Sequence, residues 1–176
     1  MSTESLGRIV AFIDGVTERL GKAIAWLTLL MVLLTFTIVV LRYVFNLGWI
    51  GMQESVLYLH GIVFMLGAGY TLKSDGHVRV DIFYQNFTER KKAYINFLGT
   101  LFLLMPVCVF IFVISIDYVQ VSWQILEQSS EAGGLPIVYL SKSLLLLLPF
   151  TLLLQGVAEL LRNIVTIVES RELERS

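Results

Sequence analysis

The sequence has few charged residues and a single cysteine, and both shortages exclude classes of function. Charged residues make up 15% of the 176 residues, against 56% hydrophobic residues, and the formal net charge is −1. Cys108 alone supports neither a disulfide framework nor a cysteine-based metal site. No basic helix with stacking motifs points to nucleic acid. No phosphate loop, nucleophile–base pattern or mid-depth acid pair is present either, so we expect no catalytic residue, cofactor or metal site.

Four long runs of the sequence are nearly free of charge. They cover residues 23–41, 55–72, 93–116 and 135–158. A hydrocarbon core of about 30 Å takes about 20 helical residues, so each run can cross a bilayer. No segment alternates apolar and polar residues with a period of two, which excludes a membrane barrel. The sequence therefore predicts an all-α integral membrane protein, one membrane domain over residues 1–176, with transmembrane helices at 23–43, 51–73, 93–118 and 136–160.

Basic residues are divided unevenly between the two sides of the predicted membrane domain. Of the 13 lysine and arginine residues, all but Arg42 and Lys142 lie before the first span, between spans two and three, or after the fourth. Lysine and arginine accumulate in cytoplasmic loops. We therefore predict that both termini, including a tail at 161–176, and the 73–92 loop are cytoplasmic.

Two segments on this predicted cytoplasmic side show amphipathic helical spacing. In residues 5–20 and again in residues 79–88, apolar side chains recur at intervals of three and four. Such segments lie along the membrane surface, and we expect two interfacial helices. Thr88 is then a candidate N-cap of the third span, and Pro136 is expected at the first position of the fourth.

The second predicted span contains two ionisable residues, which are functional candidates inside a membrane. For Glu54 we favour a carboxylate stabilised by the dipole at the helix N-terminus over a proton or cation site. His60 lies about 9 Å deeper. A bis-histidine haem is excluded because the other histidine, His77, lies in the 73–92 loop. We expect His60 to form an interhelical hydrogen bond, within this chain or to another protein.

Lys142 is the only basic residue inside the fourth predicted span. Its long side chain is expected to reach back to the membrane surface, toward Asp117, Glu127 or Glu131. A substrate-carboxylate ligand is the alternative interpretation. Four helices with so few polar residues favour a scaffold or docking subunit over a solitary transporter.

Three short motifs resemble a known family. They are "RYVFN" at 42–46, followed by Trp49 and Glu54; "GAGYTLKSDGHVRVD" at 67–81; and "GGLP" at 133–136. In order and placement the chain resembles, over about residues 15–165, the DctQ-like small membrane subunit of tripartite ATP-independent periplasmic (TRAP) transporters. That family often has two adjacent acids after the tryptophan, where this chain has Gln53 and Glu54.

The resemblance implies a sodium-driven uptake system for an organic acid or similar solute in the bacterial inner membrane. Its partners would be a large many-helix membrane subunit in a one-to-one complex, a periplasmic substrate-binding protein, and membrane lipid. The small subunit would pack on the static part of the large, elevator-type subunit, so no substrate-binding residue is expected here. The candidates for partner-interface or structural roles are Arg42, Trp49, Glu54, His60, His77, Arg79, Asp81 and Lys142.

Arg79 and Asp81 would belong to the interfacial helix that holds this scaffold at a fixed depth. The plainer interpretation is a loop kept cytosolic by its positive charge. Two other functions stay open. A membrane anchor of a redox enzyme complex would require paired intramembrane histidines or a haem shared with a partner's histidine. A small homodimeric exporter would require an essential acid in the middle of the membrane, and Glu54 lies near its helix start.

Overall fold

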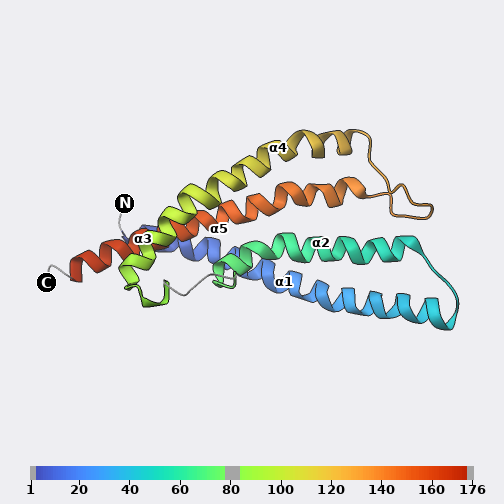
Figure 1. The fold of residues 1–176 in the computed structure, drawn as a ribbon, viewed down its shortest axis with the longest axis horizontal. Coiled ribbons are helices and arrows are strands. Elements are labelled where there is room, and N and C mark those ends of the chain that lie inside the picture. The colour runs from blue at the N-terminus through green and yellow to red at the C-terminus, as the bar shows by residue number, and fades with distance from the viewer. Residues whose placement is uncertain (1–2, 78–83, 174–176) are drawn as a thin grey trace.

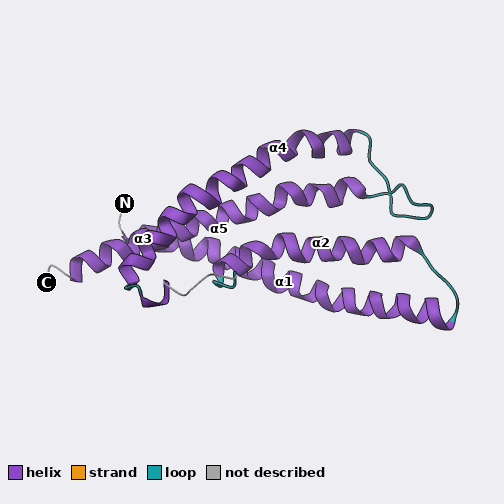
Figure 2. Ribbon diagram, viewed as in Figure 1, coloured by secondary structure: helices purple, strands orange, loops and turns teal. Residues whose placement is uncertain are grey.

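The computed structural model describes residues 3–77 and 84–173, and these residues are almost entirely helical (Figures 1 and 2). The described elements are α1 (Thr3–Val44), α2 (Ile50–Lys73), a 3-10 turn (Tyr84–Asn86), α3 (Glu89–Gly99), a π-helical stretch (Thr100–Leu104), α4 (Met105–Gln124) and α5 (Val138–Leu173). No strand occurs among the described residues. Four helical segments are long and apolar enough to cross a membrane, because α3, the π-helical stretch and α4 form one span. The prediction of an all-α protein with four membrane-spanning helices is confirmed.

The first helix is one continuous element rather than two. We expected an interfacial helix at 5–20 and a separate span at 23–43, but α1 has 42 residues without a break, about 63 Å at 1.5 Å per residue. Gly21, between the two expected elements, is helical, and the ring of Tyr70 on α2 packs against it. An added Cβ at Gly21 would lie 2.5 Å from that ring. The glycine therefore serves close helix packing and not a chain break.

The structure also gives the boundaries of the later helices, some of which differ from those expected. The helix α5 continues through the predicted tail and ends at Leu173. Thr88 is the N-cap of α3, accepting a hydrogen bond from the Lys91 backbone N–H at 3.4 Å, as predicted. Residues 78–83 of the expected 79–88 helix lie outside the described residues, and residues 84–88 contain only the 3-10 turn. Pro136 precedes α5 by two residues, so its expected first helical position is wrong.

Pro106 explains the irregular backbone within the third span. Proline has no backbone N–H, and its ring clashes with the carbonyl group four residues earlier in a regular helix. The π-helical stretch Thr100–Leu104 ends two residues before Pro106. A wider turn relieves this clash without ending the helix. The span therefore stays continuous across the proline.

The helices form an open layer with little interior. At its centre α2 packs on α5, while α1 packs beside α2 and α4 beside α5 (Figure 1). The helices α1 and α5 also contact each other, and α3 packs on α5. The buried apolar residues of the described part are few: Ile13, Ile24, Ala93, Cys108, Val119, Leu144, Pro149 and Ala158. Most apolar side chains therefore face outward, where lipid or another protein must cover them.

The connections separate into two ends of the layer. The start of α1, the end of α2, the start of α3 and the end of α5 lie at one end, called the basic end below (Figure 1). The α1–α2 and α4–α5 connections lie at the opposite end. The segments that the charge distribution assigns to one side of the membrane thus share one end of the structure.

Candidate functional site

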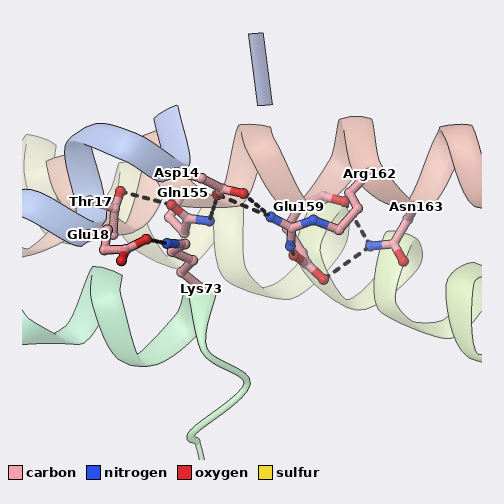
Figure 3. A network of polar contacts seen from close by, with 8 residues as sticks. All are labelled: Asp14, Thr17, Glu18, Lys73, Gln155, Glu159, Arg162 and Asn163. Atoms are coloured by element: carbon pink, nitrogen blue, oxygen red, sulfur yellow. Dashed lines mark hydrogen bonds and ion pairs between the residues drawn. The ribbon is translucent and has the colours of Figure 1, made fainter. Parts of the chain in front are cut away.

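A network of polar side chains joins α1 to α5 near the basic end (Figure 3). The guanidinium group of Arg162 donates to both carboxylate oxygens of Asp14, at 2.8 and 3.1 Å. The side-chain amide of Gln155 donates to Asp14 at 2.9 Å and accepts from the Thr17 hydroxyl at 2.9 Å. Gln155 is completely buried and Thr17 nearly so. Because each buried polar group has a partner, the network stabilises the contact without an unsatisfied charge.

Helical spacing explains why these residues meet. Asp14 and Thr17 are three residues apart on α1, and Gln155 and Arg162 are seven apart on α5, so each pair shares one helix face. Further along α5, Glu159 forms an ion pair with Arg162, and the Asn163 side chain donates to the Glu159 carbonyl oxygen at 2.8 Å. Glu159 and Asn163 thus extend the polar cluster along α5.

A second ion-pair cluster connects α1 to the last turn of α2 (Figure 3). The carboxylate of Glu18 contacts the Lys73 ammonium group at 2.7 Å and the Lys22 ammonium group at 2.7 Å. Hydrogen bonds from Lys22 and then Lys73 hold the pKa of the Glu18 carboxyl group at about 2. Together with the Asp14 network, this cluster fixes α1, α2 and α5 to one another at the basic end.

At the opposite end, Glu54 binds the α4–α5 connection. Its carboxylate accepts hydrogen bonds from the Ser129 hydroxyl and, at 2.6 Å, from the Leu135 backbone N–H. The backbone N–H of Gly51 donates to the Gly133 carbonyl oxygen at 3.1 Å. A Cβ on Gly134 would lie 2.4 Å from the Ser129 hydroxyl oxygen, so only glycine fits there without displacement. The "GGLP" motif is therefore the segment that docks on the start of α2.

The side chain of Lys142 turns back toward the same connection. Its ammonium group lies 2.5 Å from the Glu127 carboxylate and 4.1 Å from the centre of the Tyr118 ring. Of the three acids named from the sequence, the structure selects Glu127. The ion pair also lowers the pKa of the Glu127 carboxyl group, chiefly through the hydrogen bond from Lys142. Lys142 thus stabilises the connection between α4 and α5.

Arg42 and Trp49 line one cavity of about 590 Å³ at the turn between α1 and α2. Arg42 lies in the last turn of α1, and Trp49 is the N-cap residue of α2. Asn46 between them has a φ of +54°, a conformation that asparagine adopts more readily than most residues at a helix end. This explains the asparagine of the "RYVFN" motif.

The two histidines lie far apart in the layer. His60 is exposed on α2, where its ring stacks on Phe64 with centroids 6.4 Å apart. It forms no hydrogen bond with another described residue. His77 is exposed in the turn after α2. No group of three or more potential metal ligands occurs in the described part of the chain. Arg79 and Asp81 lie outside the described residues.

Sequence reasoning did not find the basic-end network. Gln155 is the one side-chain amide within the fourth apolar run, and that was the available signal. Asp14 sits among other charged residues on the first helix, where nothing in the pattern distinguishes a buried ion pair from a solvated one. The partners are 141 and 148 residues apart, so only the fold brings them together.

The fold and its polar clusters define a helical membrane protein with broad exposed apolar faces and with polar groups that join its helices. Residues 31–166 match the family model of tripartite ATP-independent periplasmic transporters, DctQ component, and the chain belongs to this family. It is therefore a small membrane subunit of a TRAP transporter and not an enzyme. No curated protein and no solved structure matches the chain.

Membership of this family also implies two partner proteins. A TRAP transporter contains a large membrane subunit and a periplasmic binding protein besides the DctQ component. Four apolar helices in a member of this family make the chain a multi-pass protein of the inner membrane.

Proposed function

We propose that this chain is the non-catalytic scaffold of a sodium-driven TRAP transporter that imports an organic acid or similar small solute. It packs one-to-one on the static part of the large subunit and holds that part in place while the carrier part moves. The observation that carries the proposal is the exposure of His60 at mid-membrane depth on an open face of α2.

At the depth of His60, a protein partner is a better environment for the imidazole than lipid. It lies ten residues after the start of α2, about 15 Å, which is half of a hydrocarbon core of about 30 Å. An imidazole facing lipid there leaves its ring nitrogens without hydrogen bonds, at a cost. A polar group on a helix of the large subunit removes that cost. Exposed residues at helical spacing extend the same face: Gln53, Leu57, His60 and Phe64.

The basic-end clusters support the bracing role. The helices α1, α2 and α5 are tied together by Asp14–Arg162, Gln155 and Glu18–Lys73. Opposite-charge pairs and buried hydrogen bonds restrict sliding between helices. A layer locked in this way can keep its neighbour at one depth and tilt, which a moving carrier requires of its support.

The membrane orientation belongs to the same proposal. With eleven of 13 basic residues on the side of the basic end, both termini and the 73–92 loop face the cytoplasm. Arg79 and Asp81 would then anchor the scaffold at the cytoplasmic membrane surface. Neutralising both, as Arg79→Gln with Asp81→Asn, should lower solute uptake while the amount of chain in the membrane stays constant. Unchanged uptake would remove this part of the proposal.

Site-specific photo-crosslinking tests the docking face directly. A benzophenone amino acid at Leu57 or Phe64 should crosslink to the co-expressed large subunit, because both residues flank His60 on the open face of α2. The matched control is Leu33, which is exposed at a similar depth on α1. Crosslinks from Leu33 alone would move the interface to α1. Crosslinks to a second copy of this chain would favour a homodimer over the scaffold.

The contribution of His60 itself is measured by co-purification. His60→Leu should reduce the amount of large subunit that stays bound during washing with detergent, because the proposed interhelical hydrogen bond is lost. Gln128→Leu is the control, since Gln128 is exposed outside the spans. Equal recovery with both variants would contradict a role for His60 in the interface.

A further inference from the structure

The cavity at the α1–α2 turn has the properties of a binding site for an amphiphilic anion. Its wall combines three kinds of side chain: a guanidinium group, aromatic rings and aliphatic groups. Arg42, Tyr43, Trp49 and Gln53 on this wall are exposed, so the cavity opens to the surroundings of the protein. At about 590 Å³ it has room for a small-molecule headgroup.

Arg42 has no counter-charge within the described part of the chain. Its side chain forms no ion pair or hydrogen bond there, and it is fully charged at any physiological pH. The other basic residue at this end, Lys142, is paired with Glu127 and covered by Tyr118. Arg42 is thus the one cation at this end of the described structure that keeps its charge free for a ligand.

No carboxylate of the described residues lines the cavity. Glu54 is the nearest acid in the sequence, but its carboxylate is turned to Ser129 and Leu135 in the α4–α5 connection. The remaining polar side-chain groups on the wall are the amides of Asn46 and Gln53, the hydroxyl of Tyr43 and the indole N–H of Trp49, each of which can donate a hydrogen bond. The cavity is therefore positively charged and rich in donors.

The depth of the cavity matches the headgroup region of a bilayer. Arg42 follows directly on the apolar run 23–41, which spans about 28 Å as a helix. Tyr43 and Trp49 are the amphipathic aromatic residues that concentrate at this level. On the membrane side of Arg42, Ile38 and Leu41 form the cavity wall. They continue into the exposed apolar face of α1.

We propose that this cavity binds the phosphate-bearing headgroup of a membrane phospholipid. The fork of Arg42 holds the phosphate oxygens by paired charge-assisted hydrogen bonds. The amides of Asn46 and Gln53 contact the polar part of the headgroup, and an acyl chain follows Ile38 and Leu41 along α1. The apolar wall distinguishes this ligand from free phosphate, which would gain nothing from it. The bound lipid fills the turn between α1 and α2 and secures the outer edge of the layer.

Native mass spectrometry of the full chain in mild detergent tests the proposal. The probe is phosphatidylglycerol, and diacylglycerol with the same acyl chains is the control that lacks phosphate. Arg42→Gln should weaken phosphatidylglycerol binding at least about tenfold, the loss expected for a charge-assisted hydrogen bond. Arg42→Lys should fall in between, because it keeps the charge but not the fork. Arg8→Gln, exposed on α1 at the basic end, should bind like the wild type.

Four results separate the possible occupants. Three results together would support the lipid site. Arg42→Gln loses phosphatidylglycerol binding, the wild type binds diacylglycerol only weakly, and millimolar inorganic phosphate does not compete with the lipid. Competition by inorganic phosphate at that concentration would overturn it in favour of a free anion. Equal lipid binding by wild type and Arg42→Gln would overturn it outright. Unchanged lipid binding by Arg42→Gln, combined with loss of binding to the periplasmic binding protein, would also overturn the lipid site, because Arg42 would then form a protein contact.

Discussion

Asp14 and Arg162 form a two-oxygen ion pair between the first and last helices of the chain, at 2.8 and 3.1 Å. The two residues are 148 positions apart. Both are partly buried, so solvent screens this pair less than an ordinary surface pair. The helix α5, which also packs on α2 and α4, is joined by this contact to the first helix of the chain. Together with Gln155 and the Glu18–Lys73 pair, this ion pair joins α1, α2 and α5 at the basic end.

The first prediction concerns this ion pair. Asp14→Asn keeps an oxygen that can accept from Gln155 but loses the charge, and Arg162→Gln loses the guanidinium fork. Each should lower stability by about 1–2 kcal/mol, because the partner charge is left half-buried. Thermal unfolding in detergent measures both variants, and Arg19→Gln, exposed on α1, is the control. The double variant should cost clearly less than the sum of the two single losses. Strict additivity would mean that the two residues do not interact.

Gln155 offers a sharper test because it is completely buried. Gln155→Leu leaves the Thr17 hydroxyl without its partner and removes one of the two hydrogen bonds to an Asp14 oxygen, and should cost about 2–3 kcal/mol. Gln155→Glu places a second carboxylate against Asp14 and should be worse still. Adding Thr17→Val to Gln155→Leu removes one orphaned group, and part of the stability should return. If Thr17→Val makes Gln155→Leu less stable, the hydroxyl is not bonded to Gln155.

The low pKa of Glu18 has a measurable consequence for pH dependence. The folded pKa of about 2 lies below the usual value of an unfolded glutamate, about 4.3. The stabilisation is therefore fully present above that usual value, and is lost as pH falls toward the folded pKa. Carboxyl ¹³C NMR, with Glu18→Gln for assignment, should show Glu18 still ionised when ordinary glutamates have half-titrated.

The cause of the shift can be tested on the same spectra. Lys22→Met should raise the titration midpoint of Glu18, because the Lys22 hydrogen bond is the largest contribution. Lys91→Met, at an exposed position on α3, should leave the midpoint of Glu18 unchanged. A wild-type midpoint near that of an ordinary glutamate would contradict the Glu18–Lys22–Lys73 cluster.

Gly134 tests the docking of the "GGLP" segment on α2. A Cβ there would collide with the Ser129 hydroxyl and come within 2.9 Å of the Glu54 carboxylate. Gly134→Ala should therefore break the hydrogen bonds of Glu54 and expose the α4–α5 connection to protease. Gly48→Ala is a matched control at the same end, because a Cβ at Gly48 meets nothing within 4 Å. Equal protease resistance of the two variants would refute the proposed docking.

The membrane orientation is open to cysteine labelling. With Cys108→Ser as background, cysteines at Ser130 and Ser74, both exposed, mark the two ends of the layer. An impermeant thiol reagent applied to spheroplasts should label the Ser130 position, and the Ser74 position only after lysis. The charge distribution requires this order. The reverse order would invert the proposed topology.

The parts of the fold that were predictable from sequence are those set by local chemistry. Apolar length alone determines the four spans, and the Thr88 side chain caps the helix that follows it because its oxygen lies next to unpaired backbone N–H groups. Gly21, through which α1 continues without a break, was not singled out in the sequence for the opposite reason. Its role depends on Tyr70 of another helix, which local pattern does not reveal.

The candidate residues show the same difference between what local sequence predicts and what the tertiary structure adds. The ion pair of Lys142 was expected from its reach, and the choice of Glu127 among three acids was made by the fold. For Glu54, the sequence suggested a carboxylate held by the dipole of its own helix. The structure adds a specific task, binding Ser129 and Leu135 of a connection 75 and 81 residues away.

By itself the sequence determined a four-span helical membrane protein of the DctQ family, because hydrophobic length, basic-residue bias and short motifs are read one segment at a time. Only the tertiary structure decided that the helices form an open layer, that Asp14 contacts Arg162, and that His60 and Arg42 have no hydrogen-bond partner among the described residues. The physical reason is that four nearly uniformly apolar helices carry little information about which faces meet. The packing is specified by a few polar groups, distant in the sequence, that pair in the folded structure.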